Sequence, residues 1–309
     1  MGQDGKYLCE YLENLNYDVY GIDNGKSIHT IQKRDGKKIY NVGVESGPSV
    51  LKIIKEIKPD EIYNLAALHR AEHQSKKNNI FSFMKTNTTG VLNILEACRK
   101  ESPGTKVFQA GSSEVFGNSF DEDGTQRLTT PMRPVNLYGC TKLLAYNLIQ
   151  YYRSAHNIFA CVGILYNHES PQRDEKFVTT KIVKTAVEIK RGIKNKLELG
   201  NIDVGRDWGH AKDYVRAMHM ILGYKAPRDW IIATGETKTI REVCSYVFSK
   251  MGLDYKNHIV KNSSFVRTEF EKTPSSKDAE IKNLLGWRPS YDFHMMLDEM
   301  IKYWDKRVV

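Results

Sequence analysis

The stretch that decides the fold runs from Gly111 to Lys142, opening with Gly111-Ser112-Ser113-Glu114-Val115-Phe116-Gly117 and closing with Tyr138-Gly139-Cys140-Thr141-Lys142. The apolar run just before it, Lys106 to Ala110, is typical of a buried strand, and Leu143 to Tyr152 just after it is typical of a helix. Ser112 and Glu114 are therefore predicted at the carboxyl end of a strand, where open α/β sheets bind their ligands. Tyr138 and Lys142 are four residues apart at a helix start, so both side chains project from one face.

These residue types indicate acid–base chemistry. A lysine ammonium beside a phenol favours the phenolate, so we expect Lys142 to lower the pKa of Tyr138 toward the working range of a general base. The alternative is an ordinary helix pair, because Tyr-x-x-x-Lys is common by chance. The preceding Ser-Ser-Glu at a strand end favours catalysis.

Composition limits the class of protein. The chain has 309 residues, of which 40% are hydrophobic and 27% charged, as in soluble globular proteins. No apolar run is long enough to span a bilayer, and no signal peptide is recognisable. The five cysteines have no paired spacing, which argues against a disulfide framework or a cysteine-rich metal site and predicts a reducing, cytoplasmic setting.

The net charge of +9 suits a ligand that carries phosphate, and it would also suit nucleic acid. No basic stripe is interleaved with aromatic residues. We interpret charge runs such as Lys33 to Lys38 as solvated loops, and we expect neither a nucleic-acid nor a membrane partner.

The chain opens with half of a dinucleotide-binding motif. Gly2 and Gly5 match the last two glycines of a G-x-x-G-x-x-G loop, and a helix over Lys6 to Asn16 and a strand over Tyr17 to Asp23 are predicted to follow. Asp23 lies near the spacing expected for an acid that binds a ribose. The first glycine and the strand before it are missing from the pattern.

Strands and helices continue to alternate after Asp23. We predict a helix over Ser49 to Lys58, a strand over Glu61 to Ala67, a helix over Ile80 to Lys100 and a strand over Ile158 to Ile164. This alternation predicts an α/β fold with a Rossmann-type, doubly wound parallel sheet.

The pattern changes after about residue 165. Longer loops, Asn167 to Lys176 and Gly200 to Gly209, indicate a smaller lobe, and a final helix is predicted over Phe293 to Lys306. We therefore predict a dinucleotide-binding domain over residues 1–165. Residues 166–309 would form mainly a substrate-binding lobe, with some segments returning to the first domain.

Two histidine patterns do not favour a metal site. The run from His69 to His73 fits the H-x-x-E-H pattern of one class of zinc peptidases, but that pattern requires an established helix. His69 instead follows a predicted strand, so a loop or supporting role is favoured. His168-Glu169 lacks ligand spacing and is interpreted as a loop.

Taken together, these residues resemble the extended short-chain dehydrogenase/reductase family, which includes the NAD-dependent epimerases and dehydratases, and within it the nucleotide-sugar 4,6-dehydratases that act on GDP-mannose. The resemblance covers nearly the whole chain. Its most specific parts are Gly2 to Gly5 with Tyr7-Leu8, Pro59 to Leu65, Ser112 to Glu114, Gly163 to Pro171 and Arg206 to Tyr214.

The resemblance implies an activity. C4 of the sugar is oxidised, water is eliminated across C5 and C6, and a hydride returns to C6, which gives a 4-keto-6-deoxy sugar used for fucose and related deoxysugars. Ser112, Glu114, Tyr138 and Lys142 would be the catalytic set, with Glu114 as the extra acid that marks a dehydratase. The cofactor is regenerated within one turnover.

The resemblance also implies binding residues. The cofactor would be NADP or NAD, held by Gly2, Gly5, Asp23, Leu65, Ala66, Ala67, Tyr138 and Lys142. The nucleotide-sugar would be held by Asn167, Lys181, Arg206 and Arg267, where arginine suits a diphosphate through paired hydrogen bonds. For Lys181 a simple surface charge remains the alternative. A homo-oligomer, dimer or tetramer, is expected.

The chain departs from the family pattern after its second strand. NADP is the family norm and is held there by basic residues, whereas this chain has Asp23-Asn24-Gly25. A carboxylate accepts hydrogen bonds from a free ribose hydroxyl and repels a phosphate, which favours NAD. Gly43 and Thr180 replace an acid and an arginine of the family, and the Arg267 to Glu269 stretch is one residue off the usual spacing.

The missing first strand has a structural consequence. In a doubly wound sheet that strand is central, so its absence would leave unpaired backbone groups on two neighbours, at about 1–3 kcal/mol each against a typical net stability of roughly 5–15 kcal/mol. We expect this form to be either an abbreviated reading of a longer gene or weakly folded and poor in cofactor. Two other functions stay open: a dehydratase of another nucleotide-sugar, and a non-catalytic nucleotide-sugar-binding relic of the family.

Overall fold

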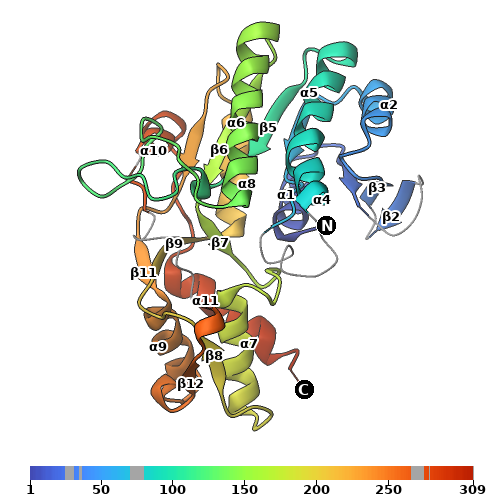
Figure 1. The fold of residues 1–309 in the computed structure, drawn as a ribbon. Helices are drawn as coiled ribbons and strands as arrows, with labels where there is room; N and C mark the ends of the chain where they lie inside the picture. Colours follow the sequence, from blue (N-terminus) through green and yellow to red (C-terminus); the bar gives the residue numbers. More distant parts are fainter. Residues whose placement is uncertain (25–30, 35–36, 70–79, 266–274, 278, 309) are drawn as a thin grey trace.

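The computed structural model describes residues 1–309 except 25–30, 35–36, 70–79, 266–274, 278 and 309. Strands and helices alternate through the first half of the chain, as predicted, except that β1, β2 and β3 follow one another without a helix between them (Figure 1). The elements of this half are α1 (Gln3–Asn14), β1 (Tyr20–Asp23), β2 (Ile31–Arg34), β3 (Lys37–Asn41), α2 (Gly47–Ile57), β4 (Glu61–Asn64), α4 (Ile80–Met84), a π-helical turn (Lys85–Thr89), α5 (Gly90–Glu101), β5 (Lys106–Ala110), a 3-10 turn (Ser113–Val115), α6 (Leu137–His156) and β6 (Ala160–Leu165).

The second half mixes short strands with helices that serve two separate cores. Its elements are β7 (Asn167–Glu169), α7 (Val178–Lys190), β8 (Leu197–Leu199), β9 (Gly205–His210), α8 (Ala211–Leu222), β10 (Trp230–Ile232), β11 (Thr237–Thr239), α9 (Ile240–Lys250), a 3-10 turn (Tyr255–Asn257), β12 (Ile259–Lys261), a 3-10 turn (Ser263–Phe265), α10 (Glu280–Leu285) and α11 (Phe293–Asp305).

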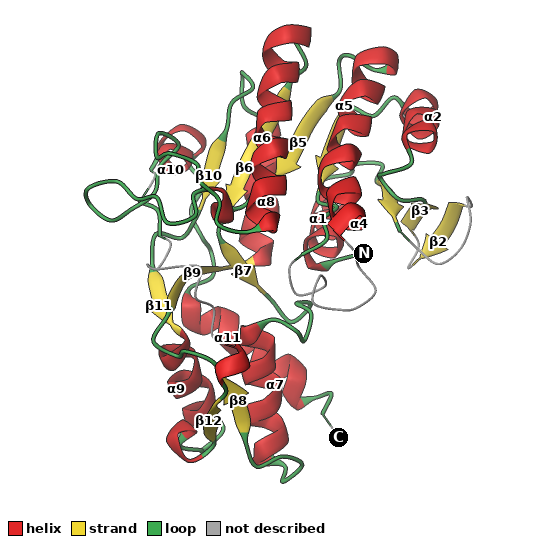
Figure 2. Ribbon diagram, in the orientation of Figure 1, coloured by secondary structure: helices red, strands yellow, loops and turns green. Residues whose placement is uncertain are grey.

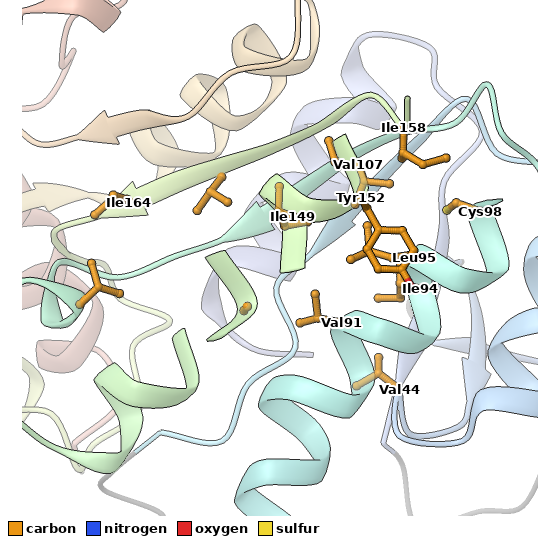
Figure 3. Packing of buried hydrophobic residues seen from close by; sticks show 14 of the residues in the cluster. Val44, Val91, Ile94, Leu95, Cys98, Val107, Ile149, Tyr152, Ile158 and Ile164 are labelled. Atoms are coloured by element: carbon orange, nitrogen blue, oxygen red, sulfur yellow. The ribbon is translucent and has the colours of Figure 1, made fainter. Parts of the chain in front are cut away.

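A four-stranded parallel sheet in the order β10-β6-β5-β4 lies in the upper half of the molecule in the view of Figure 2. Its residues alternate between two cores, as the two-residue period of a strand requires. Val162 and Ile164 of β6 pack against α5 and α6 on one face, whereas Cys161 and Leu165 pack against α8 on the other. Figure 3 shows the first of these cores, where Leu95, Val107 and Ile149 meet. The sheet is therefore covered on both faces, as in a doubly wound fold.

A second sheet, in the order β1-β3-β2, lies beside the first without joining it. β1 pairs with β3, and β4 pairs with β5, but no described strand pairs with the facing edges of β1 and β4. A cavity of about 1430 Å³ is lined by both of these strands and by α1. The described residues thus contain no central strand between β1 and β4, which is the gap that the sequence pattern predicts.

The remaining elements form a smaller lobe with its own core. Its strands make two small sheets, β11-β9-β7 and β12-β8. Apolar side chains of α7, α9 and α11 pack together there, among them Val187, Val247 and Met300. In contrast, α8 and β10 pack against the large sheet. The domain boundary near residue 165 stays a prediction.

Several details of the predicted secondary structure are wrong. Lys33 and Arg34 end β2, and Lys37 and Lys38 begin β3, rather than lying in a loop, because these strands form an antiparallel pair. The predicted loops Asn167 to Lys176 and Gly200 to Gly209 contain β7 and most of β9, which pair with each other. The predicted helix Ile80 to Lys100 is interrupted by the π-helical turn at Lys85–Thr89.

Within the described parts of the chain, no helix combines the length and the apolar character needed to cross a membrane.

Candidate active site

The site is built on a tight turn at the carboxyl end of β5. Ser112 has an extended backbone and caps the 3-10 turn that follows, because its Oγ accepts a hydrogen bond from the amide of Glu114 at 3.2 Å. The preceding strand β5 is buried almost throughout, and its packing fixes the position of the turn relative to the sheet. Both side chains therefore stand at the edge where parallel sheets bind ligands, as predicted.

Helix α6 begins beside this turn, and Asn136 connects the two. Its Oδ1 accepts a hydrogen bond from Gly139 N at 2.8 Å and so caps the helix. Its Nδ2 donates to Oε2 of Glu114, also at 2.8 Å. One residue thus starts the helix and holds one oxygen of the candidate base, which leaves Oε1 as the oxygen that can face a substrate.

Gly139 permits the close approach of α6 to the turn. A Cβ at this position would lie 2.6 Å from the carbonyl oxygen of Glu114 and 2.8 Å from Cβ of Pro134. Cβ atoms essentially never approach backbone so closely, so any side chain here would push the helix and the turn apart. The close packing of α6 on the turn therefore requires glycine at position 139, next to Tyr138.

Tyr138 lies between the turn and a group of rings. The Ser112 side chain forms a hydrogen bond with the phenol. The rings of His69 and Phe83 lie 4.8 and 6.3 Å from the Tyr138 ring, both edge-on. Burial raises the pKa of Tyr138 above its ordinary value, and the nearby Glu114 carboxylate raises it further, whereas Arg173 and the hydrogen bond from Ser112 lower it.

Lys142 is buried, with 3% of its surface exposed. Its ammonium donates a hydrogen bond to Ala110 O at 2.8 Å and lies 5.6 Å from the centre of the Tyr138 ring. Burial lowers the pKa of Lys142 to about 8. The prediction that Lys142 lowers the pKa of Tyr138 is wrong for this arrangement, because the ammonium is directed at the backbone of β5 and the cation that acts on the phenol is Arg173.

The predicted cofactor residues of the phosphate loop and of the strand ends line the large cavity. Helix α1 begins there after Gly2, and no side chain caps its first turn. Asp23 at the end of β1 reaches the amino group of Met1, with 2.5 Å between the nitrogen and Oδ2. The structure brings together on this one cavity Gly2, Gly5, Asp23, Leu65, Ala66 and Ala67.

A largely buried aspartate–histidine pair ties the start of α1 to β7. Asp4 Oδ2 lies 3.0 Å from Nε2 of His168, whose Nδ1 donates to Tyr166 O at 2.8 Å. Burial opposes charge on both groups, but their mutual attraction prevails and raises the pKa of His168 while lowering the pKa of Asp4. Gln3 adds a hydrogen bond to His168 O. The interpretation of His168 as a loop residue is wrong, since it lies in β7.

The predicted substrate residues that the structure describes lie on three elements of the smaller lobe, β7, β9 and α7. Asn167 is the first residue of β7, in register with Trp208 of β9, the strand that carries Arg206. Lys181 on α7 donates to Glu198 O at 2.7 Å and lies 3.9 Å from the centre of the Phe265 ring. Arg267 and Glu269 lie outside the described residues.

Sequence reasoning missed three supporting residues. Asn136 carries a helix-start signal, an asparagine two residues before the tyrosine, that could have shown its capping role. Asn87 in the π-helical turn bonds both backbone groups of Leu68 and Oγ1 of Thr141, which holds the loop of His69 against α6. Arg173 lines the cavity and stacks 3.5 Å from the centre of the Phe177 ring.

The zinc alternative concerns His69, Glu72 and His73. His69 lies in the loop that follows β4, as expected, and contacts the rings of Tyr138 and Phe177. Glu72 and His73 lie outside the described residues. Among the residues that are described, no cluster of three or more metal-ligating side chains occurs.

Comparisons with known proteins agree with this arrangement. A family model described as GDP-mannose 4,6 dehydratase matches residues 1–300. The chain is 35% identical to GDP-mannose 4,6 dehydratase 1 of Arabidopsis thaliana, over 97% of this chain and 86% of the relative. Its fold is similar to that of dTDP-glucose 4,6-dehydratase from Bacillus anthracis in complex with NAD, with a TM-score of 0.83 at 22% identity over 99% and 94% of the two chains.

A second solved structure is similar to the same extent. It is RMD from Pseudomonas aeruginosa complexed with NADPH, with a TM-score of 0.82 at 22% identity over 99% of this chain and 97% of that one. Likeness at this level of identity establishes the fold, so the predicted Rossmann-type α/β architecture is confirmed.

Proposed function

The chain belongs to the GDP-mannose 4,6-dehydratase family, and from this membership and the geometry of the site we propose that it converts GDP-mannose to GDP-4-keto-6-deoxymannose. It is thus a hydro-lyase of nucleotide-sugar metabolism. The observation that carries the residue assignment is the joint placement of Ser112, Glu114, Tyr138 and Lys142 where the β5 turn meets α6.

The residues around the cavity fit a nicotinamide dinucleotide. The uncapped first turn of α1 offers amide groups to a diphosphate, and Arg173 adds a positive charge on the same cavity. Asp23 offers a carboxylate to ribose hydroxyls, and Leu65 to Ala67 offer an apolar wall. When bound, the nicotinamide supplies the redox chemistry by taking up one hydride and giving it back.

Tyr138 and Ser112 act at the C4 oxygen of the sugar. Ser112 holds that oxygen by a hydrogen bond, and Tyr138 removes its proton as C4 is oxidised. Because burial keeps the phenol protonated in this structure, its ionisation needs positive charge close by. Arg173 is the cation that lowers the pKa of the phenol in this structure, and Lys142 would add to it only by turning away from the Ala110 carbonyl.

Glu114 acts next, at C5 and C6. A ketone at C4 makes the C5 proton acidic, and a carboxylate can remove that proton and deliver it to the departing C6 hydroxyl, so that water leaves. Asn136 holds Oε2 of Glu114 in place, so Oε1 is the oxygen that carries the proton. The amide donor also prevents the side chain from rotating away between the two transfers.

The smaller lobe binds the nucleotide-sugar in this proposal. Asn167 comes two residues after the end of β6, and the Asp4–His168 pair holds its strand against α1. A sugar bound at Asn167 would therefore lie next to the cofactor cavity. Arg206 and Lys181, together with Arg267, would neutralise the diphosphate.

The proposal extends to assembly and location. Exposed apolar side chains on α5 and α6, Leu92, Leu144 and Tyr151, support a homo-oligomer, dimer or tetramer. Light scattering after size exclusion tests the assembly. A cytoplasmic location follows from the cysteine pattern and is tested by fractionation.

The activity is tested with purified protein, GDP-mannose and oxidised NAD or NADP. Mass spectrometry of the sugar should show the loss of one water, with no net consumption of cofactor. UDP-glucose and dTDP-glucose serve as alternative substrates and test the choice of base and sugar. An unchanged GDP-mannose in a sample that demonstrably holds cofactor would favour the non-catalytic relic.

A further inference from the structure

The carboxylate of Glu114 is held from one side by a residue that lies far along the chain. Glu114 belongs to the turn after β5, and Asn136 comes 22 residues later, at the end of the long connection to α6. Nδ2 of Asn136 donates to Oε2 of Glu114 at 2.8 Å. Among the residues that the structure describes, no other side chain is hydrogen-bonded to this carboxylate. The orientation of the carboxylate therefore depends on one donor.

The segment that carries this donor is fixed by backbone contacts at both ends. Gly117, two residues after the turn, pairs with Arg133 in an isolated β-bridge. Gly117 has a φ of +57°, and a Cβ at this position would meet Arg133 O, so the bridge requires glycine. Three residues after the bridge, Asn136 caps α6 by accepting a hydrogen bond from Gly139 N at 2.8 Å. The Asn136 side chain therefore has a fixed position from which it holds Glu114.

The amide of Asn136 can face only one way. Gly139 N is a donor, so it must meet the amide oxygen, which leaves the NH2 group for Glu114. An NH2 group can only donate, so Oε2 of Glu114 must accept and cannot itself carry a proton in this contact. The proton that Glu114 takes up must therefore sit on Oε1, the oxygen that the contact leaves open.

From this geometry we propose that Asn136 is a positioning residue that decides how the 4-keto sugar partitions between loss of water and return of the hydride to C4. The inference rests on the proposed dehydratase function. During elimination the C5–H bond breaks toward Oε1 of Glu114, its electron pair forms the C5–C6 double bond, and the C6 hydroxyl leaves with the same proton as water.

The dependence on Asn136 follows from this sequence of events. Oε1 of Glu114 must reach two atoms in succession, first the C5 hydrogen and then the C6 oxygen, while Oε2 stays on the Asn136 amide. A carboxylate without this hold rotates out of line with one of the two atoms, and a misplacement of about 1 Å can cost a factor of about 10² in rate. The 4-keto sugar then takes its hydride back at C4 more often than it loses water.

The alternative is that Asn136 matters only as the cap of α6, the helix that carries Tyr138. The two roles concern different steps, because Tyr138 acts in oxidation at C4 and Glu114 acts in elimination. Loss of the cap alone should slow both steps, whereas loss of the hold on Glu114 should slow elimination and spare oxidation.

Two substitutions separate these roles. Asn136→Ser keeps an oxygen that can cap α6 but is too short to reach Glu114, and Asn136→Asp keeps the length and the cap but lacks the donor. Asp292→Ser exchanges the residue that caps α11 through the amide of Met295, and it is the matched control in the smaller lobe. Thermal unfolding shows whether each variant is folded.

Single turnovers of GDP-mannose measure the two steps separately. The absorbance of reduced nicotinamide follows oxidation at C4, and mass spectrometry of quenched samples follows the loss of water. We expect both Asn136 variants to lose water about 10–100-fold more slowly, while oxidation changes by less than about threefold. Deuterium at C5 should slow these variants more than deuterium at C4 does. Asp292→Ser should change neither step.

Unchanged loss of water in both Asn136 variants would overturn the proposal, and so would an equal fall in both steps, which the cap alone explains. The contact itself is tested without cofactor or sugar: Glu114→Leu should move the NMR signals of the Asn136 side-chain amide, and unmoved signals would also overturn the proposal. This measurement decides if neither Asn136 variant folds. An unsubstituted chain that holds cofactor and leaves GDP-mannose intact would instead refute the dehydratase assignment.

Discussion

The burial of Lys142 gives a prediction whose size follows from the structure. The residue is 3% exposed, its ammonium donates one hydrogen bond to Ala110 O, and burial lowers its pKa from an ordinary 10.5 to about 8. The perturbation is Lys142→Met, which keeps a side chain of similar length and removes the titrating group. Lys302→Met, at an exposed position of α11, is the matched control.

The sign follows from proton linkage. Between pH 8 and pH 10.5 the unfolded chain binds more protons at this lysine than the folded chain does, so stability rises with pH in this window and is lost again as pH falls toward 8. The full shift corresponds to about 3 kcal/mol. Between pH 7 and pH 9.5 the part gained is about 2 kcal/mol.

Urea unfolding at several pH values from 7 to 9.5 measures this effect. Groups common to all three proteins cancel when the free energies of unfolding are subtracted. From pH 7 to pH 9.5 the free energy of unfolding of the unsubstituted chain should rise by about 2 kcal/mol relative to that of Lys142→Met. Its difference from the free energy of unfolding of Lys302→Met should stay constant. A pH-independent difference between the chain and Lys142→Met would refute the reasoning that burial suppresses the charge.

Three other predictions concern the site. Glu114→Gln should lower elimination by a factor of about 10²–10⁴ while C4 oxidation continues, because an amide cannot accept the C5 proton; reduced cofactor should then accumulate in the absorbance spectrum, and near-normal turnover would contradict the role of Glu114. Gly139→Ala should cost about 1–3 kcal/mol and most of the activity, since its Cβ would meet backbone, whereas Gly104→Ala, which meets nothing within 4 Å, should change neither. Asp23 should make the protein bind NAD more tightly than NADP in a titration of cofactor-free protein, and tighter binding of NADP would mean that Asp23 does not face the ribose.

The sequence was most informative where local pattern and tertiary packing agree. Lys106 to Ala110 was predicted as a strand and is β5 with the same bounds, because a short apolar run between a breaker and a turn has no other stable placement in this fold. The placement of Ser112 and Glu114 at its end, and of Tyr138 and Lys142 on one helix, followed from strand and helix geometry alone.

The sequence was least informative where a property depends on what surrounds a residue. The pKa of Tyr138 depends on burial and on the positions of Glu114 and Arg173, which come from two other segments of the chain. The spacing of the two residues suggested Lys142 as the cation that acts on Tyr138, but the Lys142 ammonium donates its hydrogen bond to Ala110 O of β5. The short strands β7 and β9 could not be predicted from the sequence, because three to six residues with polar side chains show no clear two-residue hydrophobic period.

The gap between β1 and β4 affects the catalytic residues and the cofactor-binding residues differently. The four catalytic residues stand on the turn after β5 and on α6. The core that β5 and α6 share with α5 and β6 is continuous and lies on one side of the gap. The phosphate-binding end of α1 and the Asp23 carboxylate line the gap itself. Changes to the lining of the gap should therefore weaken the binding of the cofactor and leave the geometry of the catalytic side chains intact. Such changes should raise the cofactor concentration needed for half-maximal rate, while turnover at saturating cofactor should change least.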